Sequence, residues 1–223
     1  MIEASKSYPQ MTVIDPRKSV MTIDLESRPI PERFQHLLAL ISSERFLKRQ
    51  SLNGDIPFFI CPFKPAEAVE MARMQKQLIN RLTQAGIRVL EINLYDMAIE
   101  MLHNRSIWEQ IHEVENTVSK DEIKELLQGV LDSEHHLIPE IGVRMNQAEF
   151  EVLFITGVGE VFPYIRSHNV LNNLQSTAKE KPTVMFFPGA YTHSLEHGAS
   201  LDLFGRLHDD KYYRAFNIFH CEI

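Results

Sequence analysis

Four short apolar runs, separated by longer segments with helical spacing, constrain the fold of this chain more than any other feature. Each run shows little alternation of polar and apolar side chains, which is typical of strands buried on both faces of a sheet. Strands separated by helices need crossover connections, so the sheet should be parallel and covered on both sides. We therefore predict an α/β fold, a three-layer domain whose mainly parallel sheet has four to five strands: 56–61, 87–92, 151–156, 183–187 and a candidate fifth at 215–219.

The segments between these runs have apolar residues at helical spacing. Ser119 and Glu122 form a capping-box pattern, and Gly86 stands where a helix C-cap belongs. Helices are predicted from Pro31 onward and over 65–85, 96–116, 119–131, 133–148 and 162–178. The helix over 65–85 should place four side chains in the core: Val69, Leu78, Ile79 and Leu82.

The helices between the second and third strands are too long for a simple crossover and predict a helical insertion over 96–148. The domain organisation that follows is one α/β domain over 31–223, preceded by a partly ordered extension over 1–30. Within that extension, 11–14 and 20–25 are either short edge strands or part of a loose tail.

Composition narrows the class of protein. The chain of 223 residues has 23 Lys and Arg against 30 Asp and Glu, a formal charge of −7, which opposes direct nucleic-acid binding. No apolar window approaches a membrane span and the first ten residues are polar, so we expect no membrane association. Two cysteines, Cys61 and Cys221, form neither a disulfide framework nor a zinc site, and suit a reducing, cytoplasmic location.

The loops after the strands carry the candidate chemistry, because ligands of such sheets bind at the carboxyl ends of the strands. The first of these loops, Cys61-Pro62-Phe63-Lys64-Pro65, contains neither of the glycine-rich phosphate motifs. Nucleotide hydrolysis of the P-loop kind is therefore not expected.

Paired glycines follow the third strand, and another glycine follows the fourth. They predict a ligand or partner crevice lined by Gly157, Gly159, Glu160, Arg166, His168, Gly189 and Tyr191. The predicted helix from Pro163 should present Arg166 and His168 to this crevice in its first turns. The alternative is purely structural: the glycines make tight turns and Glu160 complements the helix dipole.

Other patterns give no catalytic, metal or cofactor site. His193 and His197 are four residues apart, but the segment between them is HSLEH and not the HEXXH of helical zinc sites. Ser194 and Ser200 lack the glycine elbow of hydrolases. We predict no catalytic residues, no metal and no cofactor, with the histidines at 193, 197 and 208 in a loop-rich stretch.

Aromatic and arginine side chains are interleaved near the C-terminus, a composition that interface centres favour. They predict a partner surface formed by Phe204, Arg206, Tyr212, Tyr213 and Arg214. The alternative is that the aromatics cap the last strand while the charges are solvated.

Five segments together resemble one known family, the BrxB family of the bacteriophage exclusion (BREX) defence systems. The resemblance covers roughly residues 33–219 and is most specific in the second half. The segments are IPFFICPFKP (56–65), GIRVLEINLYDMAIEML (86–102), TGVGEVFPYIRSHNVLNNLQ (156–175), PTVMFFPGAY (182–191) and LDLFGRLHDDKYYRAFNI (201–218).

The resemblance implies a non-enzymatic component of a phage-defence complex. It suggests an adaptor that docks the alkaline-phosphatase-like protein PglZ to other subunits, with the BrxC ATPase as a second partner and a homo-oligomer also open. It assigns no catalytic residue. A second hypothesis from the residues themselves is a nucleotide- or small-ligand-sensing or enzymatic domain that uses Glu160, Arg166, His168 and Tyr191.

Overall fold

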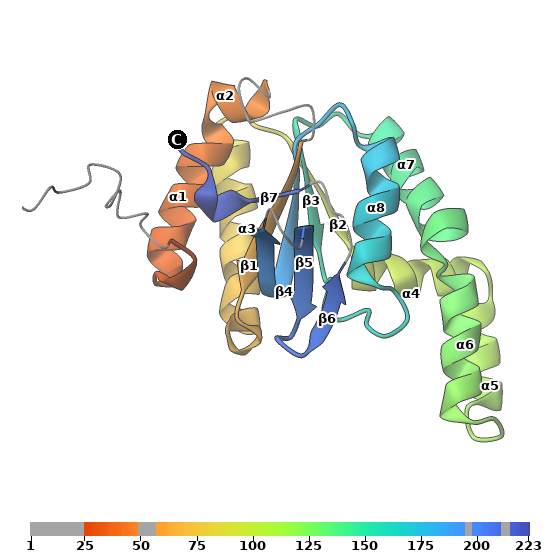
Figure 1. The fold of residues 1–223 in the computed structure, drawn as a ribbon. Coiled ribbons are helices and arrows are strands. Elements are labelled where there is room, and N and C mark those ends of the chain that lie inside the picture. Colours follow the sequence, from red (N-terminus) through yellow and green to blue (C-terminus); the bar gives the residue numbers. More distant parts are fainter. Residues whose placement is uncertain (1–24, 49–56, 195–197, 211–214) are drawn as a thin grey trace, which may run out of the picture.

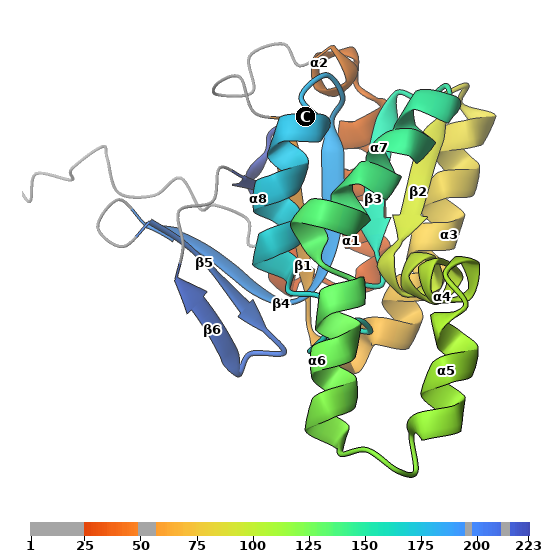
Figure 2. The same ribbon diagram turned by 90° about the vertical axis from the view of Figure 1, so that its right-hand side faces the viewer.

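The described residues form a sheet of seven strands with helices on both faces (Figures 1 and 2). The fold comes from a computed structural model, which describes residues 25–48, 57–194, 198–210 and 215–223. The proposed edge strands at 11–14 and 20–24 therefore lie outside the described residues, and Leu25 begins a short 3₁₀ turn that ends at Ser27.

Five strands form the parallel part of the sheet in the order β2-β3-β4-β1-β7. All four apolar runs are strands of this sheet and the candidate fifth is present, which confirms the predicted α/β fold. Their bounds are β1 Phe58–Phe63, β2 Val89–Asn93, β3 Val152–Thr156, β4 Thr183–Ser194 and β7 Phe216–Asn217.

The apolar runs are continuous because neighbouring residues in each strand pack into two separate cores. Phe59 and Cys61 of β1 belong to one core, whereas Phe58 and Ile60 belong to the other. All six residues of β1 are buried, so either face would lose contacts if a polar residue were placed there.

One face of the sheet is covered by α1 (Ile30–Ser42), α2 (Glu44–Leu47) and α3 (Ala68–Gln84). A 3₁₀ turn, Pro65–Glu67, precedes α3, and Gly86 closes the segment after it in the left-handed conformation (φ +83°). Leu78 and Leu82 are buried and Ile79 packs against the same core, as predicted. The prediction for Val69 is wrong: it is 68% exposed because it lies on the solvent side of the first turn of α3.

The other face is covered by α4 (Leu94–Asn104), α7 (Ile138–Gln147) and α8 (Ser167–Thr177). Between α4 and α7 the chain forms α5 (Ile107–Val114), α6 (Lys120–Val130) and a π-helical turn at Ser133–Leu137. The predicted capping box at Ser119 and Glu122 is present. The single helix predicted over 96–116 is instead two helices, broken where Ser106 adopts a left-handed conformation (φ +56°).

The helix predicted over 162–178 begins only at Ser167. Before it, the chain passes through turns in which the carbonyl of Val161 accepts hydrogen bonds from the amides of Tyr164 and Ile165. Arg166 is extended at the N-cap, so it lies outside the helix that was expected to present it.

The segment treated as loop-rich is largely an antiparallel extension of the sheet. β4 leaves β1 at Gly189 and pairs with β5 (Gly198–Leu203), which in turn pairs with β6 (Leu207–Asp210). Figure 2 shows β5 and β6 standing away from the parallel strands. A side chain at Gly189 would meet the carbonyl oxygen of Asp202 at 2.1 Å, so only glycine allows this close approach of the two strands.

Candidate functional site

The carboxyl end of β1 lies beside Pro188 and Gly189 in the middle of β4, where the crossover helices change from one face of the sheet to the other. The helix after β1, α3, covers one face of the sheet, whereas α8, which leads into β4, covers the other. Such a switch point leaves an opening between neighbouring strands and is where α/β proteins usually bind ligands.

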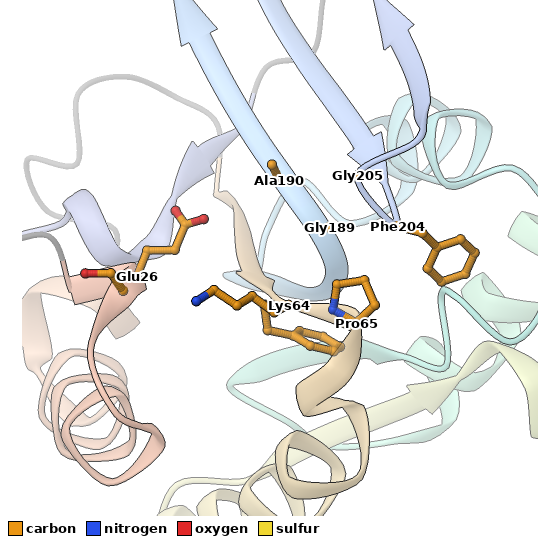
Figure 3. A pocket seen from close by; sticks show the side chains of 9 residues that line it. Glu26, Lys64, Pro65, Gly189, Ala190, Phe204 and Gly205 are labelled. Carbon is orange, nitrogen blue, oxygen red and sulfur yellow. The ribbon is translucent and has the colours of Figure 1, made fainter.

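A pocket of about 500 Å³ lies at this point (Figure 3). Figure 3 shows Lys64 extending toward the side that carries Glu26, with the ring of Phe204 on the opposite side. Residues from four segments line it: Glu26, Ser27, Phe63, Lys64, Pro65, Gly189, Ala190, Phe204 and Gly205. The lining is mostly apolar and suits a hydrophobic group better than a phosphate.

The loop after β1 uses its polar groups for its own structure. The amide of Lys64 donates to the Glu67 carboxylate at 3.3 Å, and that carboxylate also pairs with the buried guanidinium of Arg33 at 2.8 Å. Pro65 has no amide hydrogen to offer. A phosphate at this position would therefore find no row of free backbone N–H groups of the kind that phosphate loops provide.

A second pocket of about 380 Å³ lies between the start of α8 and the β5–β6 hairpin. Arg166 and Arg206 both line it, and the first turn of α8 contains no acidic side chain. Two guanidinium groups beside a helix N-terminus suit a small oxyanion or a carboxylate. The other lining residues are Phe162, Ser167, His168, Leu201, Leu203 and Leu207.

The seven residues of the predicted crevice are divided among different surroundings. Gly189 lines the first pocket, and Arg166 and His168 line the second. Glu160 is exposed and lines neither of the two. Tyr191 is buried, and its hydroxyl donates to the carbonyl of Ala215 at 2.6 Å; burial raises the pKa of Tyr191 to about 12.

Gly157 and Gly159 are required by packing. A side chain at Gly157 (φ +68°) would meet the Asn93 amide oxygen at 2.3 Å, and this oxygen caps α4 by accepting from the amides of Tyr95 and Asp96. A side chain at Gly159 would meet the Pro188 ring at 2.7 Å. The absence of a side chain at both positions therefore allows the loops at the carboxyl edge of the sheet to pack closely together.

The predicted partner surface is described only in part. Phe204 is half-buried at the β5–β6 turn, with its ring edge-on to Phe162 at a centroid distance of 6.4 Å, and Arg206 is exposed beside it. Tyr212, Tyr213 and Arg214 lie outside the described residues.

The sequence interpretation missed the hairpin turn itself, although a signal was present. Leu201-Asp202-Leu203 and the Leu207 that pairs with Leu203 have the alternation of strands, and the loop Phe204-Gly205-Arg206 separates them. Phe204 and Gly205 both have positive φ, as short hairpin loops require.

Burial opposes the thiolate form of both cysteines. Burial raises the pKa of Cys61 far above its usual range and that of Cys221 to about 11, so both remain protonated. Across the described segments, no three His, Cys, Asp or Glu side chains converge on one point. The described helices also include none with the length and hydropathy of a membrane span.

Comparison with known proteins identifies the family. The family model of BREX protein BrxB matches residues 90–218, more than half of the chain. A BREX protein BrxB of Bacillus cereus (strain H3081.97) is 32% identical over 197 residues, covering 86% of this chain and 98% of the relative. Another from Escherichia coli O9:H4 (strain HS) is 26% identical over 186 residues, covering 83% and 90%. No solved structure matches the chain. The chain therefore belongs to the BrxB family of BREX proteins.

Proposed function

We propose that this chain is a non-enzymatic adaptor that docks a PglZ-like protein to other subunits of a BREX complex, such as the BrxC ATPase. The observation that carries the proposal is the β5–β6 hairpin, which extends the sheet beyond the two-faced core. At its turn, Arg206 and Leu207 are exposed and Phe204 is half-buried. An arginine beside exposed apolar side chains is a composition that interfaces favour.

The outer strand of the hairpin supports the same function. Among the described residues, β6 pairs only with β5, and a strand edge left unpaired in this way is a surface to which a partner strand can add. In the loop after β1, by contrast, the Lys64 amide donates to Glu67 and Pro65 has no amide hydrogen to donate. The molecule is thus better equipped to bind a protein at the hairpin than to turn over a nucleotide.

The test is co-purification of the chain with the PglZ-like and BrxC-like proteins of its own BREX system, one at a time. Arg206→Glu combined with Leu207→Ser should weaken association with the PglZ-like protein by more than about tenfold, the loss typical of an interface hot spot. Both positions are exposed, so the melting temperature of the variant should change little.

The matched control is Arg73→Glu combined with Val69→Ser on α3, which makes the same charge reversal and also replaces an exposed aliphatic side chain by serine, on the opposite face of the sheet. It should bind as the wild type does. A folded hairpin variant that binds normally would remove the hairpin from the interface, and failure of every BREX protein to co-purify would remove the adaptor function.

A further inference from the structure

The helical insertion carries a pair of helices that the rest of the domain does not bury. Figure 2 shows α5 and α6, joined by a turn, projecting beyond the edge of the sheet. In the described chain, α5 contributes no buried residue and α6 contributes only Leu127. The two helices, with the turn between them, are called the α5–α6 hairpin (residues 107–130).

The hairpin is anchored at its base. The Arg105 guanidinium donates to the carbonyl of Val130 at 3.1 Å, and the Gln128 amide donates to the carbonyl of Pro163 at 3.0 Å. Ile107, Trp108 and Val130 also pack against the core there. Helices of 8 and 11 residues are too short to be stable alone, so these base contacts must hold them in place.

Away from the base, apolar side chains remain accessible. Val114 is half-buried without joining either core cluster of the described residues, and Leu126 is 43% exposed. Ile111 and Ile123 are half-buried and pack against the core, so Val114 and Leu126 are the apolar side chains left for a partner. One such side chain on each of two joined helices gives an apolar surface of the kind against which the apolar face of a third, amphipathic helix packs.

The net negative charge of the α5–α6 hairpin indicates which kind of partner helix it would bind. Residues 107–130 hold six acidic side chains against two basic ones, a formal charge of −4 out of −7 for the whole chain. All six acidic residues are exposed. A partner segment rich in Lys and Arg would be attracted to this surface, whereas an acidic one would be repelled.

We infer that the α5–α6 hairpin is a docking surface for a basic amphipathic helix of a partner protein, whose apolar face covers Leu126 and Val114 while its cations pair with Glu113 and Glu125. The inference deepens the proposed function and rests on it, because an adaptor that joins two proteins needs two separate surfaces. Figures 1 and 2 show the α5–α6 hairpin and the β5–β6 hairpin on different parts of the molecule.

The direct test uses a synthetic peptide helix with a leucine face and a lysine face as the probe, titrated into the full chain by calorimetry. Glu113→Lys combined with Glu125→Lys, and separately Leu126→Ser, should each weaken its binding by about tenfold or more. Binding should also weaken as sodium chloride is raised. Neither glutamate forms an ion pair among the described residues, so the charge change should leave the fold intact.

Two control variants match these changes elsewhere. Glu70→Lys with Glu222→Lys makes the same change in net charge at exposed positions, and Val69→Ser removes an apolar side chain that is more exposed than Leu126. Both should bind the probe as the wild type does. Equal binding by a peptide whose lysines are replaced by glutamate would overturn the inference, as would equal losses in the control variants.

The reconstituted BREX complex separates this inference from the proposed function. Hydrogen exchange should show the amides of 107–130 protected in the complex, and cross-links should connect them to a basic helical segment of a partner. A complex that forms while these amides exchange as in the free chain overturns the inference alone. If light scattering shows a dimer that Leu126→Ser dissociates, the surface belongs to a second copy and the inference is also wrong.

Discussion

At the scale of single residues, glycines and one tyrosine determine how the carboxyl edge of the sheet is assembled. Gly189 allows β4 to leave the parallel sheet and pair with β5, and Gly157 makes room for the Asn93 cap. The Tyr191 hydroxyl ties β4 to the carbonyl of Ala215, close to the start of β7. In the sequence, Gly157, Gly189 and Tyr191 suggested a ligand crevice. In the structure, they allow or make the contacts between loops and strands.

Gly189→Ala should destabilise the protein, by about 1–3 kcal/mol in the free energy of unfolding. The new methyl group would lie 2.1 Å from the Asp202 carbonyl oxygen and 2.9 Å from the Phe187 ring, and a backbone carbonyl cannot move without shifting β5. Urea unfolding measures the change. Gly129→Ala in α6 is the control, since its methyl group would meet nothing within 4 Å and should stabilise that helix. Equal effects of the two substitutions would contradict this account of Gly189.

At the scale of elements, the sequence predicted best where one physical cause dominates. The continuous apolar runs predicted the parallel strands because burial on both faces leaves no room for polar side chains. The break at Ser106 was missed because neither glycine nor proline marks it. The β5–β6 hairpin was missed because its alternation is short. The division of the predicted crevice residues between two pockets depends on where β4 bends at Gly189, which no local pattern in the sequence specifies.

Ser119→Ala should loosen α6 by about 1 kcal/mol, because the Ser119 hydroxyl accepts from the Glu122 amide while the Glu122 carboxylate accepts from the Ser119 amide. Since α6 projects from the core, the loss should appear as faster hydrogen exchange over 120–130, with little change in global unfolding. Thr83→Ala in α3 is the control, because its hydroxyl only donates to the Ile79 carbonyl within the helix and caps nothing.

The same capping box predicts a pH dependence for α6. Hydrogen bonds from Ser119 lower the pKa of Glu122, so the folded carboxylate holds its proton less tightly than the unfolded one. The contribution of the Glu122 carboxylate to the stability of α6 is therefore complete above the ordinary pKa of a glutamate. It is lost as the pH falls through the lowered pKa of the folded state. Exchange over 120–130, corrected for the intrinsic pH effect, should rise on acidification in the wild type but not in Glu122→Gln, whose amide oxygen can accept from the Ser119 amide without titrating. An equal rise in both would show that the Glu122 carboxylate is not the group responsible.

At the scale of the whole molecule, the fold has the switch point of a ligand-binding α/β domain, but the residues there have other roles. The Lys64 side chain is exposed, and its backbone amide donates a hydrogen bond to the Glu67 carboxylate. Pro65 and Phe204 make the first pocket largely apolar. The helical insertion and the β5–β6 hairpin add surface away from this pocket. The architecture alone would suggest a nucleotide, whereas the loop after β1 lacks the row of free amides that a phosphate needs.

The isolated chain should neither hydrolyse ATP nor be stabilised by it, because the loop after β1 offers one lysine and no row of free amides to a phosphate. A nucleotide present at 100 times its Kd would raise the free energy of unfolding by about 2.7 kcal/mol, which a thermal melt detects readily. We expect no such rise with magnesium and ATP, in the wild type or in Lys64→Ala. A rise that Lys64→Ala removes would place a nucleotide in the first pocket and contradict the adaptor interpretation of that edge. A different outcome would assign oxyanion binding to the pocket between α8 and the β5–β6 hairpin, where Arg166 and Arg206 are the cations. In that case inorganic phosphate would raise the free energy of unfolding as ATP does. Arg166→Gln would remove the rise, whereas Lys64→Ala would not.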